Sequence, residues 1–159
     1  GYWRDVGTIT SLWDANMDML STDRINLYDP AWPISSRSPI CPPSYVGEDA
    51  KIVHSIVTEG CSIDGLIENS VLSSEVKVGR GAKVLYSVLM PGAVVEDGAV
   101  VEYAIVGENT VVKAGAHVGA APDGTDEWGV ATCGPNITIK AGAVVKSGAM
   151  IYTGEEVEL

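Results

Sequence analysis

Three consecutive blocks of seventeen residues decide the fold: SVLSSEVKVGRGAKVLY (70–86), SVLMPGAVVEDGAVVEY (87–103) and AIVGENTVVKAGAHVGA (104–120). Each block begins with a small residue followed by two aliphatic residues, and Ser55-Ile56-Val57 has the same form fifteen residues before Ser70. A short fixed period of this kind is typical of a solenoid, in which each block forms one turn. This repeated stretch is therefore predicted to form the body of the protein.

Each block divides into three short strands, mostly six residues apart, with a five-residue step closing the turn. Three strands per turn describe a triangular prism, the left-handed parallel β-helix built from hexapeptide repeats. The fold class is thus predicted to be mainly β, a hexapeptide-repeat solenoid preceded by a short helix and a Pro-rich connector. The expected strands are 55–57, 61–63, 65–67, 70–72, 76–78, 82–84, 87–89, 93–95, 99–101, 104–106, 110–112, 116–118, 137–139, 143–145 and 149–151.

The alternation of side chains along a strand separates the inside of this prism from its outside. The first and third residues of each strand point one way and the middle residue points the other way. From 55 to 118 every third position is Val, Ile or Leu, and nearly all first positions are small. Burial of one such aliphatic side chain contributes on the order of 1.5–3 kcal/mol. A Val-to-Asp change is therefore expected to cost far more at a third position than at a middle one.

The outward-pointing middle residues differ between the faces of the prism. On one face they form a continuous apolar column, which consists of Ile56, Val71, Val88 and Ile105. An exposed apolar column is a candidate interface, although β-propensity alone also favours Val and Ile. We predict these four residues as an interface, covered by the N-terminal helix and connector, by a further domain or by another subunit.

The N-terminal part is expected to lie on that surface. Apolar residues at helical spacing predict a short helix from Ser11 to Leu20, where Ser11 and Asp14 resemble a capping box. Residues 25–45 contain five prolines, which exclude a regular helix and predict an extended connector. The apolar residues expected to anchor the connector to the surface that it crosses are Leu27, Tyr28, Trp32 and Ile34.

The repeat is interrupted by a polar insertion at about 120–135. Loops of that length inside a repeat usually carry contacts or function. Asp123, Asp126 and Glu127 in this loop are a candidate cation site, and a solvated acidic loop is the simpler interpretation. The acidic tail 155–158 is expected to cap the open end of the solenoid.

Composition excludes several classes of function. The 159 residues carry a net charge of -11, which argues against nucleic-acid binding and against attraction to an anionic membrane. Three cysteines without CxxC-type spacing indicate neither a disulfide framework nor a zinc site. The sequence contains no apolar run long enough for a membrane span and no secretory signal. We therefore expect an acidic cytoplasmic protein.

Several motifs together resemble one enzyme family. They are Gly1-Tyr-Trp-Arg-Asp-Val-Gly-Thr-Ile9, Ala15-Asn-Met-Asp18, Leu27-Tyr-Asp-Pro-Ala-Trp-Pro33, Cys61 and Ser87-Val-Leu-Met90. In this combination the chain resembles the C-terminal part of bacterial glucose-1-phosphate adenylyltransferase (ADP-glucose pyrophosphorylase). The resemblance implies an upstream nucleotidyltransferase domain that converts ATP and glucose 1-phosphate to ADP-glucose and pyrophosphate for glycogen synthesis. It also implies that the β-helix serves subunit assembly, usually into tetramers, and communication with allosteric effectors.

The resemblance also implies a division of the chain and one metal ligand. Residues 1–24 would end the nucleotidyltransferase domain, 25–45 would form the connector and 46–159 the β-helix. Asp5 matches the aspartate that helps to hold the catalytic Mg²⁺, whereas the Gly-rich nucleotide loop and the other ligands of the family lie upstream. We therefore expect this chain alone to bind no cofactor and to lack adenylyltransferase activity, with the catalytic domain and further copies of itself as partners.

One corner departs from the family pattern. The chain reads Ile105-Val106-Gly107-Glu108-Asn109 where relatives commonly read Ile-Ile-Asp-Lys-Asn. A lysine there would suit an anionic activator, and Glu108 would repel one. The departure predicts that activator control through this corner is weak or absent.

Two other functions remain open from the residues. A hexapeptide acyltransferase would need a histidine base, for which His54 and His117 are the candidates. No Asp or Glu is convincingly placed to orient either ring, so surface histidines are the simpler interpretation. The second alternative is a purely structural oligomerisation module without a ligand.

Overall fold

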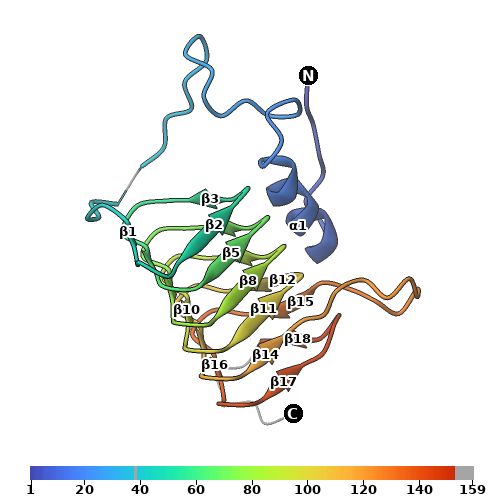
Figure 1. Cartoon of the computed structure of the whole chain (residues 1–159). Helices are drawn as coiled ribbons and strands as arrows, with labels where there is room; N and C mark the ends of the chain where they lie inside the picture. The colour runs from blue at the N-terminus through green and yellow to red at the C-terminus, as the bar shows by residue number, and fades with distance from the viewer. Residues whose placement is uncertain (38, 153–159) are drawn as a thin grey trace.

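The computed structural model describes residues 1–37 and 39–152, which form one short helix and a stack of short strands (Figure 1). The acidic tail predicted to cap the solenoid lies outside the described residues. None of the described residues belongs to a helix that is long and apolar enough to cross a membrane.

Three six-stranded parallel sheets form the faces of the prism. Sheet A contains β1 (Tyr45–Val46), β4 (Ser62–Ile63), β7 (Lys77–Val78), β10 (Val94–Val95), β13 (Val111–Val112) and β16 (Thr138–Ile139). Sheet B contains β2 (Lys51–Val53), β5 (Leu66–Glu68), β8 (Lys83–Leu85), β11 (Val100–Glu102), β14 (His117–Val118) and β17 (Val144–Val145). Sheet C contains β3 (Ile56–Val57), β6 (Val71–Leu72), β9 (Val88–Leu89), β12 (Ala104–Val106), β15 (Ala131–Cys133) and β18 (Met150–Ile151).

Consecutive strands pass from sheet A to sheet B to sheet C, so that each turn adds one strand to every sheet. The register joins residues one block apart: Val88 pairs with Val71 on one side and with Ile105 on the other. The predicted parallel β-helix is confirmed, and a strand is found at each position where the triplet pattern placed one.

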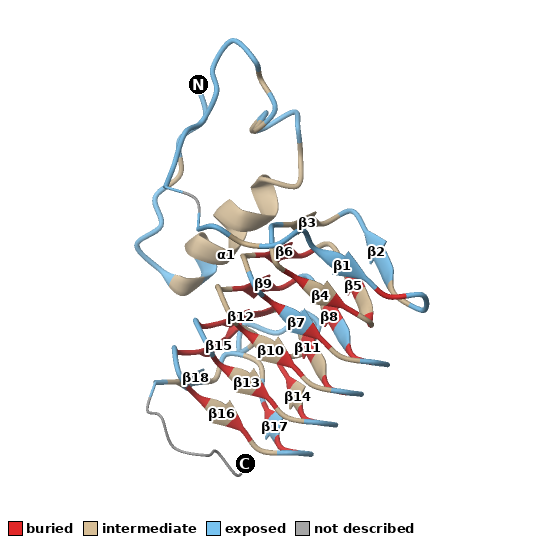
Figure 2. Cartoon of the chain, turned by 90° about the vertical axis from the view of Figure 1, so that its left-hand side faces the viewer, coloured by how far each residue is buried: buried red, intermediate tan, exposed pale blue. Residues whose placement is uncertain are grey.

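The interior follows the predicted alternation of large and small side chains. Third-position residues such as Leu72, Leu89 and Val101 are completely buried, and so are first-position residues such as Ala99 and Ala116. Figure 2 shows that buried residues recur in strand after strand along the stack. The narrow prism is therefore filled by one aliphatic and one small residue per strand.

Serines at the heads of successive turns form a polar row, in which Ser70 and Ser87 are buried and Ser55 is half-buried. The hydroxyl of Ser55 accepts a hydrogen bond from the backbone N–H of Ser70 (3.1 Å), and the hydroxyl of Ser70 accepts one from Ser87 (3.0 Å). Ser87 in turn accepts from the N–H of Ala104 (3.2 Å). Buried polar groups are tolerated where they are hydrogen-bonded, and these bonds explain why small hydroxyl residues occupy these positions.

Three strands were not predicted from the repeat: β1, β2 and β15. The triplets that form them are Ser44-Tyr45-Val46, Ala50-Lys51-Ile52 and Ala131-Thr132-Cys133, which also begin with a small residue. Prolines just before the first triplet hid the pattern, and in the last one Cys133 takes the place of the inward aliphatic residue. Burial raises the pKa of the Cys133 thiol to about 12. The insertion consequently covers 119–130 and ends earlier than expected.

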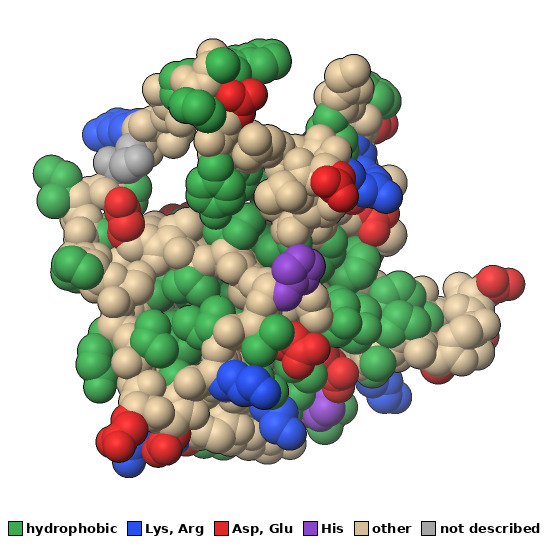
Figure 3. Space-filling view, turned by 45° about the horizontal axis from the view of Figure 1, so that its top comes forward, with side chains coloured by type: hydrophobic (Ala, Val, Ile, Leu, Met, Phe, Trp, Pro, Cys, Tyr) green, Lys and Arg blue, Asp and Glu red, His purple; other side chains and the backbone are tan. Residues whose placement is uncertain are grey.

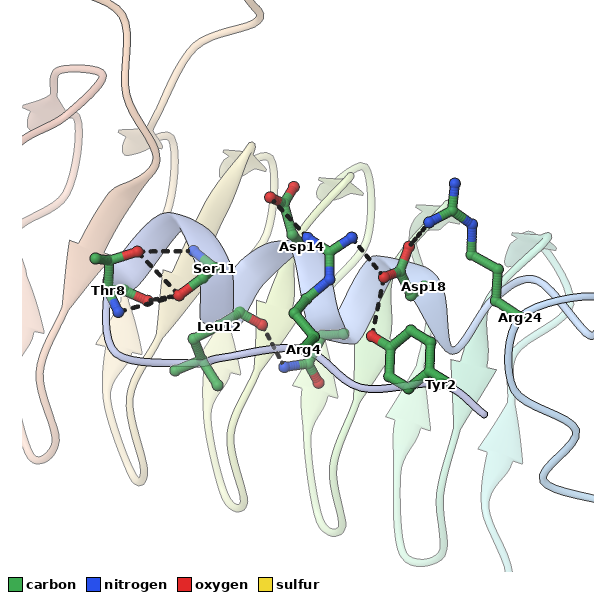
Figure 4. Close-up of polar contacts among 9 residues, drawn as sticks. Tyr2, Arg4, Thr8, Ser11, Leu12, Asp14, Asp18 and Arg24 are labelled. Carbon is green, nitrogen blue, oxygen red and sulfur yellow. Dashed lines mark hydrogen bonds and ion pairs between the residues drawn. The ribbon is translucent and has the colours of Figure 1, made fainter.

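The helix α1 (Ile9–Asp18) begins two residues before the predicted start. Its N-cap is Thr8, whose Oγ1 accepts the N–H of Ser11 (3.1 Å), while the Ser11 hydroxyl accepts the N–H of Thr8 (3.0 Å) (Figure 4). The predicted capping pair of Ser11 and Asp14 is therefore wrong. Asp14 instead forms an ion pair with Arg4.

The connector leaves the end of α1 and passes above the β-helix before it enters β1 (Figure 1). Leu27 is half-buried, but the other expected anchors are exposed: Tyr28 by 77%, Trp32 by 81% and Ile34 by 68%. Their predicted anchoring on this chain is wrong, because the extended, proline-rich segment does not lie flat on a sheet. In Figure 3, hydrophobic side chains are exposed on the segments that rise above the β-helix.

Candidate functional site

The helix α1 lies against the outer face of sheet C (Figure 2). Val88 and Ile105 are only 2% and 4% exposed, although they point away from the prism interior. The residues that cover this apolar cluster together with Val130 are Ile9, Leu12, Trp13, Met17, Met90 and Trp128. A short helix of the same chain thus fills the centre of this face.

The four residues predicted as an interface do form one continuous row in sheet C. Val71 is also buried, and Ile56 is half-buried at the top of the row. The sequence left open whether the N-terminal part, a further domain or another subunit covers this row. In the structure the N-terminal helix covers its middle. A role of these residues in contacts between subunits remains a prediction.

Four aromatic rings connect α1, sheet C and the insertion. Trp13 of α1 donates its indole N–H to the backbone oxygen of Tyr86 (2.8 Å). The rings of Tyr86 and Tyr103 stack with centroids 4.7 Å apart, and Trp128 meets Tyr103 edge-on at 5.8 Å. Trp13 lies 6.0 Å from Tyr103. Such ring pairs contribute about 0.5–1.5 kcal/mol beyond their burial, so this cluster at the edge of sheet C helps to hold α1 on the sheet.

The tyrosines belong to a row at the corner between sheets B and C, here called the corner column: His54, Asn69, Tyr86 and Tyr103. All four have a positive φ, between 43° and 47°. This left-handed conformation is uncommon for a bulky residue. The chain nevertheless has His and Tyr there: the Tyr103 ring and the backbone oxygen of Tyr86 meet Trp13 of α1, and His54 meets the residue after the C-cap of α1. His54 contacts the carbonyl oxygen of Leu20 through Nε2 (3.1 Å), and Nδ1 lies 2.7 Å from Oδ1 of Asn69.

Asp18 ties the first residues of the chain to α1 (Figure 4). Its carboxylate accepts the hydroxyl of Tyr2 (2.9 Å) and pairs with Arg4 (2.8 Å) and Arg24 (3.1 Å). Desolvation and the hydrogen bond to Asp18 raise the pKa of Tyr2. The segment before α1 and the segment after it are therefore joined through one carboxylate.

The predicted ligands for cations are not brought together. Asp5 is exposed, and its Oδ1 accepts the N–H of Gly7 (3.0 Å). In the insertion, Asp123 accepts two hydrogen bonds from Thr125, which hold the pKa of Asp123 below its ordinary value. Within 1–37 and 39–152, no group of three or more His, Cys, Asp or Glu residues is placed to hold a metal ion. The candidate cation site in the insertion is thus not assembled among the described residues, and the solvated acidic loop remains the simpler interpretation.

The two histidines have different surroundings. Contrary to the expectation that no acid orients either ring, Nε2 of His117 lies 2.6 Å from Oε1 of Glu102. The pair is on the outer face of sheet B, where the His117 side chain is 42% exposed. The sequence missed this contact because the two residues are fifteen apart and meet only across adjacent turns.

Glu108 lies exposed at the corner between sheets C and A, next to Asn109 with its positive φ of 54°. Within the described residues its side chain forms no ion pair. The corner thus presents a carboxylate to solvent.

The corner column was not predicted as a site, although the sequence contains a signal for it. Tyr86 and Tyr103 are the last residues of two consecutive blocks, so the period itself places one ring above the other. Trp128 had no such signal, because it reaches the cluster from the insertion and not from the repeat. Its indole N–H donates to the backbone oxygen of Ala120 (2.8 Å), which ties the two ends of the insertion together.

Most of the chain is similar in sequence to known proteins. Residues 43–139 match the family described as GlmU-like, C-terminal hexapeptide. The chain is 47% identical over 119 residues to the glucose-1-phosphate adenylyltransferases of Bacillus thuringiensis (strain Al Hakam) and Bacillus anthracis, which covers 74% of this chain and 32% of theirs. It is 52% identical over 95 residues to that of Clostridioides difficile (strain 630), which covers 59% of this chain and 25% of the relative. The chain therefore spans a third or less of these relatives, and they confirm the resemblance found in the motifs.

Proposed function

This chain belongs to the family of GlmU-like C-terminal hexapeptide domains, and we propose that it is the assembly and regulatory part of a glucose-1-phosphate adenylyltransferase. The whole enzyme would join ATP and glucose 1-phosphate to give ADP-glucose and pyrophosphate for glycogen synthesis in the cytoplasm. The proposal is supported by relatives of that name, of which this chain spans about a third.

The observation that carries the proposal is the docking of α1 on sheet C. The segment before α1 is joined to the helix through Asp18, and the helix buries Val88 and Ile105 of the solenoid. A domain attached ahead of Trp3 would therefore be coupled to the β-helix through packed contacts as well as through the chain. Such a connection suits a part that assembles subunits and transmits a change between domains.

We assign the exposed apolar residues of the N-terminal part to contacts with the catalytic domain. Trp3 is 84% exposed, Val6 52%, Trp32 81% and Ile34 68%. Large apolar side chains that are this exposed are candidates for contact with a further domain. Further copies of the chain would add to the assembly, which we expect to be a tetramer.

Asp5 does not form a metal site by itself, because among the described residues no group of three or more His, Cys, Asp or Glu is placed to hold a metal ion. In the whole enzyme we propose that its free carboxylate oxygen contributes one ligand to Mg²⁺, with the other ligands supplied by the catalytic domain. The metal would offset the charge of the phosphates. The chain alone is therefore expected to bind no Mg²⁺ tightly and to have no adenylyltransferase activity.

A chimera tests this proposal. This chain would replace the matching part of the Bacillus anthracis relative, and pyrophosphate release and mass by light scattering would be measured. We expect an active oligomer, and we expect the same chimera with Ile105→Lys to assemble less well, with Val111→Lys as the matched control. Turnover of ATP and glucose 1-phosphate by the 159-residue chain alone, or a chimera that is folded but unassembled and inactive, would contradict the proposal.

The exposed carboxylate of Glu108 further supports weak control by anionic activators. In the same chimera, Glu108→Lys is expected to increase activation by a sugar phosphate. Strong activation of the unchanged chimera, with no difference in the variant, would exclude this role.

The contact between His117 and Glu102 favours a second candidate, a hexapeptide acyltransferase with a carboxylate-oriented imidazole. Binding of acetyl-CoA by the chain, lost in His117→Asn, would support this alternative over both the adenylyltransferase and a purely structural module. No binding at millimolar acetyl-CoA would exclude it.

A further inference from the structure

The corner column contains a gap in a row of stacked rings. Its members follow one another down the edge of the prism, because the N–H of Asn69, Tyr86 and Tyr103 each donates to a carbonyl of the turn before. Successive turns of a parallel sheet are about 4.8 Å apart, which lets the rings of Tyr86 and Tyr103 stack. The next position holds Asn69, whose short amide leaves the other face of Tyr86 without a ring.

A pocket of about 290 Å³ lies at this gap. Tyr86 lines it from the solenoid, and Trp13, Met17 and Leu20 line it from α1 and the residue that follows its C-cap. The polar residues that line it are Ser21, His54 and Asn69. The pocket thus combines one free aromatic face, an apolar wall and a small number of polar groups, which is the usual make-up of a small-molecule site.

The polar groups are not equally available. Both nitrogens of His54 are engaged, one by Leu20 and one by Asn69. The Asn69 amide nitrogen contacts Glu68 at 3.4 Å. Across the described part of the chain, no residue hydrogen-bonds the hydroxyl of Ser21. This hydroxyl is therefore the group with which a ligand can form a new hydrogen bond.

We propose that this pocket binds a flat, uncharged heteroaromatic ring, which stacks on Tyr86 in place of the missing ring and hydrogen-bonds Ser21. A stacked ring continues the row that Tyr103 and Tyr86 begin, and base-type rings gain about 1–3 kcal/mol from one aromatic partner. A net charge of -11 disfavours an anion. The site is independent of the proposed assembly role, and its occupant would also contact α1.

The test uses benzimidazole as the probe and the complete 159-residue chain. Nuclear magnetic resonance follows the ring protons of the probe, because stacking on a phenol ring shifts them upfield, and the indole N–H of Trp13, which bonds Tyr86. Cyclohexanol, of similar size but without an aromatic face, is the control ligand. An upfield shift of the probe, with weaker binding of cyclohexanol, is expected.

Asn69→Tyr is the decisive variant, since it fills the gap with the residue that positions 86 and 103 already accept at the same φ. It should weaken benzimidazole binding at least about tenfold without lowering the unfolding temperature. Asn136→Tyr places the same residue at another positive-φ corner and should bind as the unchanged chain does. If Asn69→Tyr does not fold, Tyr86→Leu should abolish the upfield shift. The proposal would be overturned if the unchanged chain gave no shift, or if Asn69→Tyr or, in its place, Tyr86→Leu bound benzimidazole as well as the unchanged chain.

Discussion

The outer faces of sheets A and C are built from triplets of the same pattern but have different surroundings. On sheet A, the outward Val94 and Val111 are half-exposed, and Lys77 occupies the same row. On sheet C, Val88 and Ile105 are buried beneath α1. The difference shows that an outward aliphatic row becomes an interface only where a second element covers it. The following predictions test that contrast, from the largest effect to the smallest.

The largest effect is expected inside the prism, which both faces share. Val101 is completely buried, and its neighbour Val100 points outward. Val101→Asp should lower the free energy of unfolding by about 4 kcal/mol or more, because it buries an unpaired charge. Val100→Asp should cost about 1 kcal/mol or less. Urea unfolding measures both, and equal losses would contradict the inward and outward assignment.

The next effect separates the two outer faces directly. Ile105→Lys should lower the free energy of unfolding by about 2–3 kcal/mol, since it removes a buried side chain and places a charge under α1. Val111→Lys on sheet A should cost about 1 kcal/mol or less, because Lys77 already occupies that row. Similar losses for the two variants would show that α1 does not seal sheet C.

A smaller effect isolates one contact of the helix. Trp13→Phe keeps an aromatic ring but removes the hydrogen bond to the oxygen of Tyr86, which should cost about 1 kcal/mol. Trp3→Phe is the control, because Trp3 is 84% exposed and should leave stability unchanged. Chemical denaturation compares the free energies of unfolding of the two variants. A larger loss from Trp3→Phe would contradict the assignment of the stabilising contact to Trp13.

The smallest effect concerns the ion pair of Lys113 and Glu96, which no helix of the described residues covers, and it depends on pH. The Lys113 ammonium holds the pKa of Glu96 below its ordinary value of 4.5. Because the folded pKa is the lower one, the pair stabilises the protein above pH 4.5, and this contribution is lost as pH falls through the lowered pKa. Lys113→Gln should therefore reduce stability slightly at neutral pH and make no difference once Glu96 is protonated.

Unfolding curves at neutral and acidic pH check this prediction, with Lys83→Gln as a control that removes an exposed lysine from another face. A difference for Lys113→Gln that grew on acidification would give the opposite sign and refute the assignment.

The prism could be predicted from the sequence because its constraint is local and repeated. Each inward position must be aliphatic or small, so the triplets report the fold without any knowledge of distant contacts. The same rule applies to Ser44-Tyr45-Val46, which prolines precede, and to Ala131-Thr132-Cys133, in which a cysteine takes the inward aliphatic position; both were missed for these reasons. The start of α1 was misplaced because Thr8 and Ser11 both fit a capping role in sequence.

The covered surface of sheet C was less predictable, because it depends on which element of the chain packs against the sheet. The apolar row from Ile56 to Ile105 was visible, but three covers were compatible with it, and only the packing of α1 selects one. The apolar residues Tyr28 and Trp32 suggested anchoring on the chain, yet they are exposed. Apolar composition shows that a side chain needs a partner and does not show which partner it has.

The most direct test of the docking of α1 on sheet C is amide hydrogen exchange of the complete chain. An isolated helix of ten residues is marginal in water, so protection of Ile9–Asp18 reports docking. We expect protected amides in α1, fast exchange there in Ile105→Lys, and unchanged protection of the central strands in both proteins. Fast exchange of α1 in the unchanged chain, or full protection in the variant, would contradict the account.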